Sequence, residues 1–159
     1  FTDSDWGSCY STTGWLFKLG QATISWSSKR QQSIALSSCE AEIMAASEAA
    51  KEAVCLKRFA TELDSACVAS TVPLSADNQA AIDLAYNPEH HQRTKHIDRR
   101  HFFVRDCVEN MQISVPYVGT ADNQADFFTK PLASKKFFAM RQLIVNENRV
   151  AGPALPPSG

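Results

Sequence analysis

Acidic residues stand where predicted secondary-structure elements begin or end, in four separate parts of the chain. Asp3 and Asp5 alternate with small residues in an extended stretch, Glu42 lies near the start of a helical segment, Asp77 follows an apolar run, and Asp126 precedes two phenylalanines. Alternation along a strand would point Asp3 and Asp5 to the same side. If these carboxylates converge, their repulsion requires cations, and such oxygen ligands suit Mg²⁺ or Mn²⁺. The sequence therefore predicts a divalent-metal site.

The helical phase of Glu42 places it on a buried stripe. At 100° per residue, seven apolar residues of this segment fall within about 60° of Glu42: Ala45, Ala46, Ala49, Ala53, Leu56, Ala60 and Leu63. Glu40 points the other way. A carboxylate that faces a core needs a cation or a metal. Two simpler roles stay open: Glu42 could favour the helix dipole and reach solvent, and Asp77 could be a helix N-cap.

The elements that would position these acids follow from local patterns. Residues 13–19 and 22–26 are rich in β-branched and aromatic residues around Gly20, which predicts a hairpin. Ser37 and Glu40 have the spacing of a capping box, which predicts a helix from there to residue 63. Strands are predicted at residues 72–76 and 113–118, and helices at residues 78–86, 97–109, 122–130 and 134–145. This order indicates an α/β fold, a mixed sheet covered by helices.

A basic segment lies on an otherwise neutral chain, whose formal net charge is −1. Residues 90–105 hold all four histidines and five Lys or Arg residues. The segment has three interpretations: a zinc site, which its lack of cysteines at ligand spacing disfavours, a solvated basic helix face, and a phosphate-contacting surface. The candidates for contact with nucleic acid are Arg93, Lys95, His96, Arg99 and Arg100.

Length and composition predict one domain with its own core, since 44% of the 159 residues are hydrophobic. No run approaches the roughly 18 apolar residues of a membrane span, and the chain does not begin with a signal peptide, so we expect an intracellular protein. Residues 1–147 are expected to form the domain and residues 148–159 a disordered tail. The start at Phe1 suggests a truncated first strand. Trp6, Trp15 and Trp26 are expected in the core.

Seven stretches occur together in an order that is typical of one protein family. They are SDW at residues 4–6, STTGW at 11–15, ISWSSKRQ at 24–31, ALSSCEAE at 35–42, DNQAAI at 77–82, RTKHIDRRHFF at 93–103 and ADNQADFFTKPL at 121–132. In this order they resemble the ribonuclease H domain of copia-type LTR retrotransposon Pol polyproteins. The resemblance spans nearly the whole chain, and ALSSxEAE and RTKHID are its most specific parts.

The resemblance implies a ribonuclease H-like fold, in which a five-stranded mixed sheet with its first three strands antiparallel is flanked by helices. It assigns the catalytic, metal-binding positions to Asp3, Glu42, Asp77 and Asp126, with two Mg²⁺ ions per site, or Mn²⁺ as a substitute. The implied activity is endonucleolytic hydrolysis of the RNA strand of RNA–DNA hybrids, which leaves a 5′-phosphate and a 3′-hydroxyl. The implied setting is a polyprotein with a reverse transcriptase domain, in a cytoplasmic retrotransposon particle or the nucleus.

Some features depart from the related enzymes and keep a second function open. Residues 119–124 (GTADNQ) lack the histidine that cellular relatives carry before the last acid, although copia-type members generally do without it. The link at residues 7–10 is shorter than is usual in the family. Alternatively, therefore, the domain serves as a non-catalytic structural or interaction subunit of a larger assembly.

Overall fold

A three-stranded antiparallel sheet forms the centre of the molecule. The computed structural model describes residues 1–7, 9–63, 71–87 and 95–145, with only the backbone of residues 95–98. Strands β1 (Thr2–Asp5), β2 (Thr12–Leu19) and β3 (Ala22–Arg30) pair in the order β1-β2-β3. The β2–β3 hairpin turns at Gly20, whose φ of 59° suits glycine. The predicted hairpin is therefore confirmed.

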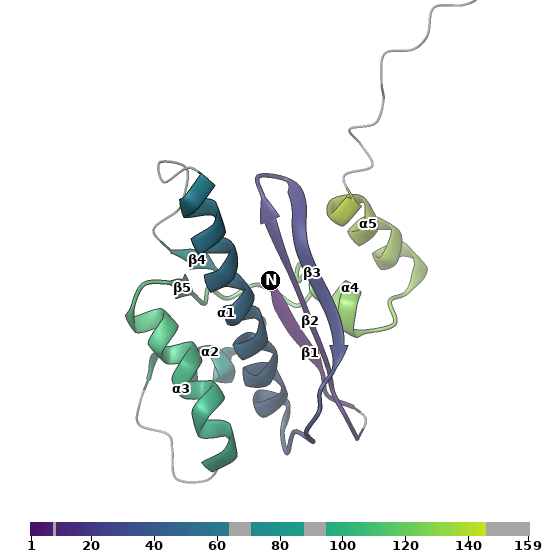
Figure 1. Ribbon diagram of the computed structural model, residues 1–159. Helices are drawn as coiled ribbons and strands as arrows, with labels where there is room; N and C mark the ends of the chain where they lie inside the picture. The colour runs from purple at the N-terminus through teal and green to yellow at the C-terminus, as the bar shows by residue number, and fades with distance from the viewer. Residues whose placement is uncertain (8, 64–70, 88–94, 146–159) are drawn as a thin grey trace, which may run out of the picture.

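Helices cover both faces of this sheet (Figure 1). Helix α1 (Ser38–Leu63) packs on one face, and α4 (Asp126–Thr129) and α5 (Ser134–Val145) lie on the other. Successive side chains along β2 point to opposite faces of the sheet, and this separates two cores. Phe17 contributes to the core under α1, whereas its neighbour Leu16 packs with Met140 and Ile144 of α5. None of the helices in the described part of the chain is long and apolar enough to cross a membrane.

A second, shorter sheet lies beside the first. Strands β4 (Val72–Pro73) and β5 (Ile113–Ser114) are parallel, and α2 (Gln79–Tyr86) and α3 (Lys95–Glu109) complete the fold. The Thr2 amide donates to the Ser75 carbonyl at 2.9 Å and so links β1 to the end of β4. The predicted α/β fold is confirmed, but its five strands form a three-stranded and a two-stranded sheet. Prolines 73 and 116 lack an amide proton for the ladder, which accounts for the short β4 and β5.

Helix α1 begins at a capping box that is slightly different from the predicted one. The Glu40 amide donates to Ser37 Oγ at 3.1 Å, while the Glu40 carboxylate accepts from the Leu36 amide at 2.7 Å. Glu40 is therefore buried and does not point to solvent as its helical phase predicted. The predicted apolar stripe is buried as far as Ala53, but Leu63 is exposed. A helix of 26 residues is about 39 Å long and outruns strands of about 30 Å.

The expectation that all three tryptophans lie in the core is wrong for two of them. Trp6 and Trp26 are 52% and 62% exposed, whereas Trp15 packs against the core under α1. Trp26 lies on the edge strand β3, and Trp6 follows the end of β1, where its indole N–H donates to the Ala35 carbonyl at 3.2 Å. Edge positions leave one side of such rings without a packing partner.

Candidate functional site

Three of the predicted acids meet at one end of the central sheet. Asp3 lies on β1, Asp77 lies between β4 and α2, and Asp126 is the first residue of α4. One ligand oxygen from each lies within 4.8 Å of the others. Asp3 and Asp126 are almost fully buried, and Asp77 is half-buried. Asp5, the alternative to Asp3, lies at the end of β1 and is not part of this group of three.

Glu42 approaches the same region from α1, although it lies outside the group of three. Its Oε1 accepts from the Ser4 amide at 3.1 Å and from Ser4 Oγ at 2.9 Å. Burial, together with the charge of Asp3, raises the pKa of Glu42 to about 8, although the hydrogen bonds from Ser4 oppose this shift. The second oxygen, Oε2, is buried and has no hydrogen-bond partner among the described residues. The prediction that Glu42 faces inward is confirmed, and its solvent-facing alternative is wrong.

Asp77 is not the cap of the helix that follows it. The N-cap of α2 is Asn78, whose side-chain oxygen accepts from the Ala81 amide at 3.1 Å. The Asp77 carboxylate is thus free of that structural task and lies beside Asp3 and Asp126. The N-cap role, which was the alternative expected for Asp77 from its place before a helix, is carried out by Asn78.

Cationic side chains already compensate two of the acids. Lys130 Nζ donates to Asp3 Oδ1 at 3.1 Å and to Asp126 Oδ1 at 2.8 Å, and Lys136 Nζ donates to Asp126 Oδ2 at 2.6 Å. The Thr129 hydroxyl donates to Asp3 Oδ2. These four contacts occupy every carboxylate oxygen of Asp3 and Asp126.

Burial and neighbouring cations shift the pKa values of Asp3 and Asp126 in opposite directions. Burial raises the pKa of Asp3 to about 6, although Thr129 and Lys130 oppose the shift. Burial also acts to raise the pKa of Asp126, but the hydrogen bonds from Lys130 and Lys136 hold it below its usual range. Burial acts to lower the pKa of Lys130, but its contacts with Asp126 and Asp3 raise it above its usual range. Asp126 and Lys130 are therefore both charged at neutral pH.

The chemistry of the donor set fits a divalent cation. Three carboxylate oxygens within 4.8 Å of one another, all oxygen donors, are of the kind that Mg²⁺ and Mn²⁺ bind. Glu42 Oε2 adds a buried acceptor without a partner, which is costly unless a donor or a cation reaches it. Asp3, Asp77 and Asp126 could hold one ion directly, and Glu42 could contribute to a second.

The sequence patterns did not single out Ser4, Thr129, Lys130 or Lys136. Ser4 holds Glu42, and the other three hold Asp3 or Asp126. One signal was available: Lys130 is four residues after Asp126, a spacing at which opposite charges meet on a helix. The contacts of Lys130 with Asp3 and of Lys136 with Asp126 have no such local signal, because they join residues from different elements.

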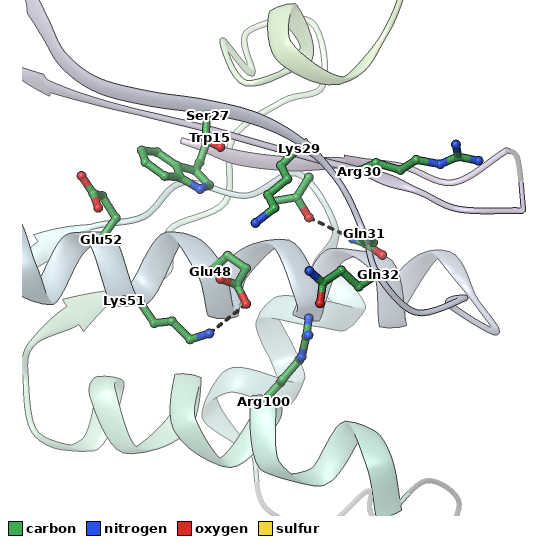
Figure 2. A pocket seen from close by; sticks show the side chains of 11 residues that line it. Trp15, Ser27, Lys29, Arg30, Gln31, Gln32, Glu48, Lys51, Glu52 and Arg100 are labelled. Atoms are coloured by element: carbon green, nitrogen blue, oxygen red, sulfur yellow. Dashed lines mark hydrogen bonds and ion pairs between the residues drawn. The ribbon is translucent and has the colours of Figure 1, made fainter.

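A polar groove of about 420 Å³, lined by none of the four acids, lies where β3 and α3 flank α1 (Figure 2). Lys29 on β3 and Arg100 on α3 point toward α1 from its two sides, and Glu48 and Lys51 of α1 lie between them. Lys51 pairs with Glu48 at 2.8 Å. Among the described residues, Lys29 and Arg100 have no ion pair or hydrogen bond, so this groove has uncompensated positive charge.

The predicted basic segment divides between two surfaces. Arg100 lines the groove over α1, whereas Arg99 lines a separate, open depression with Phe102 and Arg105 of α3. Successive helical residues point about 100° apart, which accounts for this separation. Arg93 lies outside the described residues, as do the side chains of Lys95 and His96. The predicted tail at residues 148–159 also lies outside them.

The chain is similar to segments of known Pol polyproteins. The chain is 41% identical over 134 residues to a retrovirus-related Pol polyprotein from the tobacco (Nicotiana tabacum) transposon TNT 1-94, a match that covers 84% of the chain and 10% of the polyprotein. It is 36% identical over 141 residues to the retrovirus-related Pol polyprotein from the Arabidopsis thaliana transposon RE1, with 86% of the chain and again 10% of the polyprotein covered. The chain thus spans about a tenth of the length of these relatives. No protein-family profile matches it.

A solved structure shows the same fold. The crystal structure of ribonuclease H1 from the halophilic archaeon Halobacterium salinarum superposes with a TM-score of 0.59 at 16% sequence identity. The similarity covers 80% of this chain and 90% of the archaeal one. At that identity the comparison establishes the fold alone.

Proposed function

The chain is homologous to a segment of the Pol polyproteins of plant retrotransposons and has the ribonuclease H fold, and from this starting point we propose that it is a Mg²⁺-dependent endonuclease that hydrolyses the RNA strand of RNA–DNA hybrids. The observation that carries the proposal is the convergence of Asp3, Asp77 and Asp126 within 4.8 Å, with Glu42 beside them. These acids come from β1, α1, α4 and the segment between β4 and α2. Neither helix capping nor packing accounts for their convergence.

Each acid has a defined task in this proposal. Asp3, Asp77 and Asp126 would hold a divalent cation directly, and the unpartnered Oε2 of Glu42 would be a further ligand. Bound metal supplies an activated water and stabilises the departing 3′ oxygen. Ser4 orients the Glu42 carboxylate through two hydrogen bonds, so that Oε2 and not Oε1 is available. Products carry a 5′-phosphate and a 3′-hydroxyl.

Hybrid recognition would use the groove over α1. Its cations, Lys29 and Arg100, suit the phosphates of a nucleic-acid backbone. Proteins recognise such duplexes through their backbone, their 2′-hydroxyl groups and their shape, without contacts to the bases. Glu48 lies six residues after Glu42, about 9 Å farther along α1. That distance corresponds to roughly two to three base pairs at 3.4 Å each. A strand that reaches the acids can therefore also reach the groove.

The cleavage test uses a labelled RNA–DNA hybrid with Mg²⁺ and three versions of the chain. Wild type should cut the RNA strand, Asp77→Asn should not, and Asp83→Asn should cut as wild type does. Asp83 is an exposed residue of α2, so its substitution makes the same charge change away from the acids. A folded wild-type chain that binds the hybrid without cutting it would favour the non-catalytic role in a larger assembly.

The binding test compares two neighbouring arginines. Arg100→Ala and Lys29→Ala should each weaken hybrid binding and reduce the log–log salt slope by roughly one. Arg99→Ala reports whether the duplex also reaches the other side of α3, since Arg99 lines a different depression. A salt slope that is unchanged in Arg100→Ala and Lys29→Ala would remove the groove from the binding surface.

The setting of the reaction is also part of the proposal. The relatives are Pol polyproteins roughly ten times longer than the matched segment, so we propose that the domain works beside a reverse transcriptase domain in a parent polyprotein. A cytoplasmic retrotransposon particle, or the nucleus, is the compartment that this origin favours.

A further inference from the structure

Lys130 lies between two of the three converging acids. It is the C-cap residue of α4, and its amide donates to the Asp126 carbonyl at 3.1 Å. Its ammonium group donates to the Oδ1 atoms of both Asp3 and Asp126, at 3.1 and 2.8 Å. The Lys130 side chain is 35% exposed, whereas those of Asp3 and Asp126 are 1% and 2% exposed. The ammonium therefore closes the solvent side of the acid group.

The two oxygens that Lys130 bridges are the ones that would be available to an ion shared by Asp3 and Asp126. The remaining oxygens already have other partners, because Thr129 donates to Asp3 Oδ2 and Lys136 to Asp126 Oδ2. A divalent ion held by both acids must approach oxygens to about 2.0–2.6 Å. A second cation so close would repel it strongly. The ammonium and the ion cannot occupy this position together.

We propose that Lys130 is an internal counter-ion that occupies the metal position in the metal-free protein and leaves it when a divalent cation binds. This inference rests on the proposed function, since it concerns the same acids. Metal entry and the departure of Lys130 are then one exchange. The exchange keeps the buried acids compensated at all times, and it lowers the affinity for the metal by the free energy of the lysine contacts.

Lys136 and Lys135 provide matched comparisons. Of the three acids, Lys136 contacts Asp126 alone, through Oδ2, and it also donates to the Thr120 carbonyl at 3.4 Å. It therefore contributes charge without bridging the acids. Lys135 is exposed on the same helix, and no described contact joins it to the acids. Replacing either removes one positive charge, as replacing Lys130 does.

The test is calorimetric titration of the metal-free chain with Mn²⁺ and with Mg²⁺. Lys130→Met should bind the metal roughly tenfold or more tightly than wild type, since an opposite charge within 4–6 Å shifts a carboxylate's ionisation by about one to three pKa units. Lys135→Met should stay within about twofold of wild type, and Lys136→Met should show a smaller gain than Lys130→Met. Equal or weaker metal binding by folded Lys130→Met would overturn the inference.

A second measurement uses the wild-type chain and does not depend on the variant's folding. Acetylation of individual lysines, followed by mass spectrometry, reports how accessible each amine is. Lys130 should react slowly without metal and several-fold faster in saturating Mg²⁺, while Lys135 reacts equally in both. A Lys130 rate that is constant or falls on metal binding contradicts the exchange. Loss of hybrid cleavage alone, with the metal titration as expected, would count against the proposed function and not against the role of Lys130.

Discussion

Gly14 on β2 and Thr129 on α4 lie so close together that a β-carbon at residue 14 would come within 2.5 Å of Thr129 Cγ2. The same β-carbon would lie 3.0 Å from Phe128 Cβ and 3.1 Å from the Ala125 carbonyl. Gly14 pairs with Asp3 across the β1–β2 ladder. The absent side chain therefore lets α4 settle on the sheet directly opposite Asp3, which brings Thr129, Lys130 and Asp126 to that acid.

Substituting Gly14 with alanine should disrupt this contact and the metal site together. The added methyl group meets backbone and short side chains that cannot yield easily, so we expect a loss of about 1–3 kcal/mol in unfolding free energy. The displaced α4 should also weaken Mn²⁺ binding. Thermal unfolding and calorimetry measure the two effects. Gly119→Ala is the matched control, because its nearest contact would be an ordinary 3.7 Å from Asp122 Oδ2. Equal behaviour of the two variants would show that the α4 contact is not critical.

Stability without metal should fall as pH rises, because Glu42 and Asp3 are harder to ionise in the folded state. Burial and neighbouring charges raise the pKa of Glu42 from 4.5 to about 8 and burial raises that of Asp3 from 3.8 to about 6. A raised folded-state pKa contributes stability that is complete below the unfolded value and is lost as pH passes through the folded value. The unfolding free energy in EDTA should therefore decline between about pH 4 and pH 8, by a few kcal/mol in order of magnitude.

Urea titrations of wild type and Glu42→Gln across this pH range measure the decline. The variant lacks the Glu42 contribution, so its curve should be flatter, above about pH 6 in particular. Saturating Mg²⁺ should reduce the decline in the wild type, since metal binding stabilises the ionised acids. Parallel curves for the two proteins would show that Glu42 is not the group responsible.

Replacing Asp77 with asparagine should raise the melting temperature in metal-free buffer, even though it abolishes cleavage. Its carboxylate lies within 4.8 Å of those of Asp3 and Asp126, and the described ion pairs compensate only those two. Relief of this repulsion should add roughly 2–4 °C, the equivalent of about 1 kcal/mol. Asn78→Ala, which removes the α2 cap, should instead cost about 1 kcal/mol. A fall in melting temperature for Asp77→Asn would assign Asp77 a structural role.

Much of the site could be predicted from the sequence, because its features depend on residues that are close together in the chain or on motifs that a protein family shares. The inward direction of Glu42 follows from helical periodicity, which depends only on spacing along α1. The hairpin, the capping-box serine and the long α1 also arise from neighbouring residues. The identities of Asp3, Asp77 and Asp126 came from motif resemblance, since none of them carries a local signal that separates a ligand from a cap.

The tertiary structure decided which groups meet. Lys130 compensates Asp3 only because Gly14 leaves room for α4 on the sheet, and Lys130 is more than 100 positions from both of these residues in sequence. The exposure of Trp6 and Trp26 could not be predicted, because it depends on which strand lies at the edge of the sheet and on what packs beyond the end of β1. Lys29 and Arg100 likewise share a groove only after β3 and α3 pack on opposite sides of α1. Such contacts depend on how elements pack, and pairwise spacing along the chain carries no record of that packing.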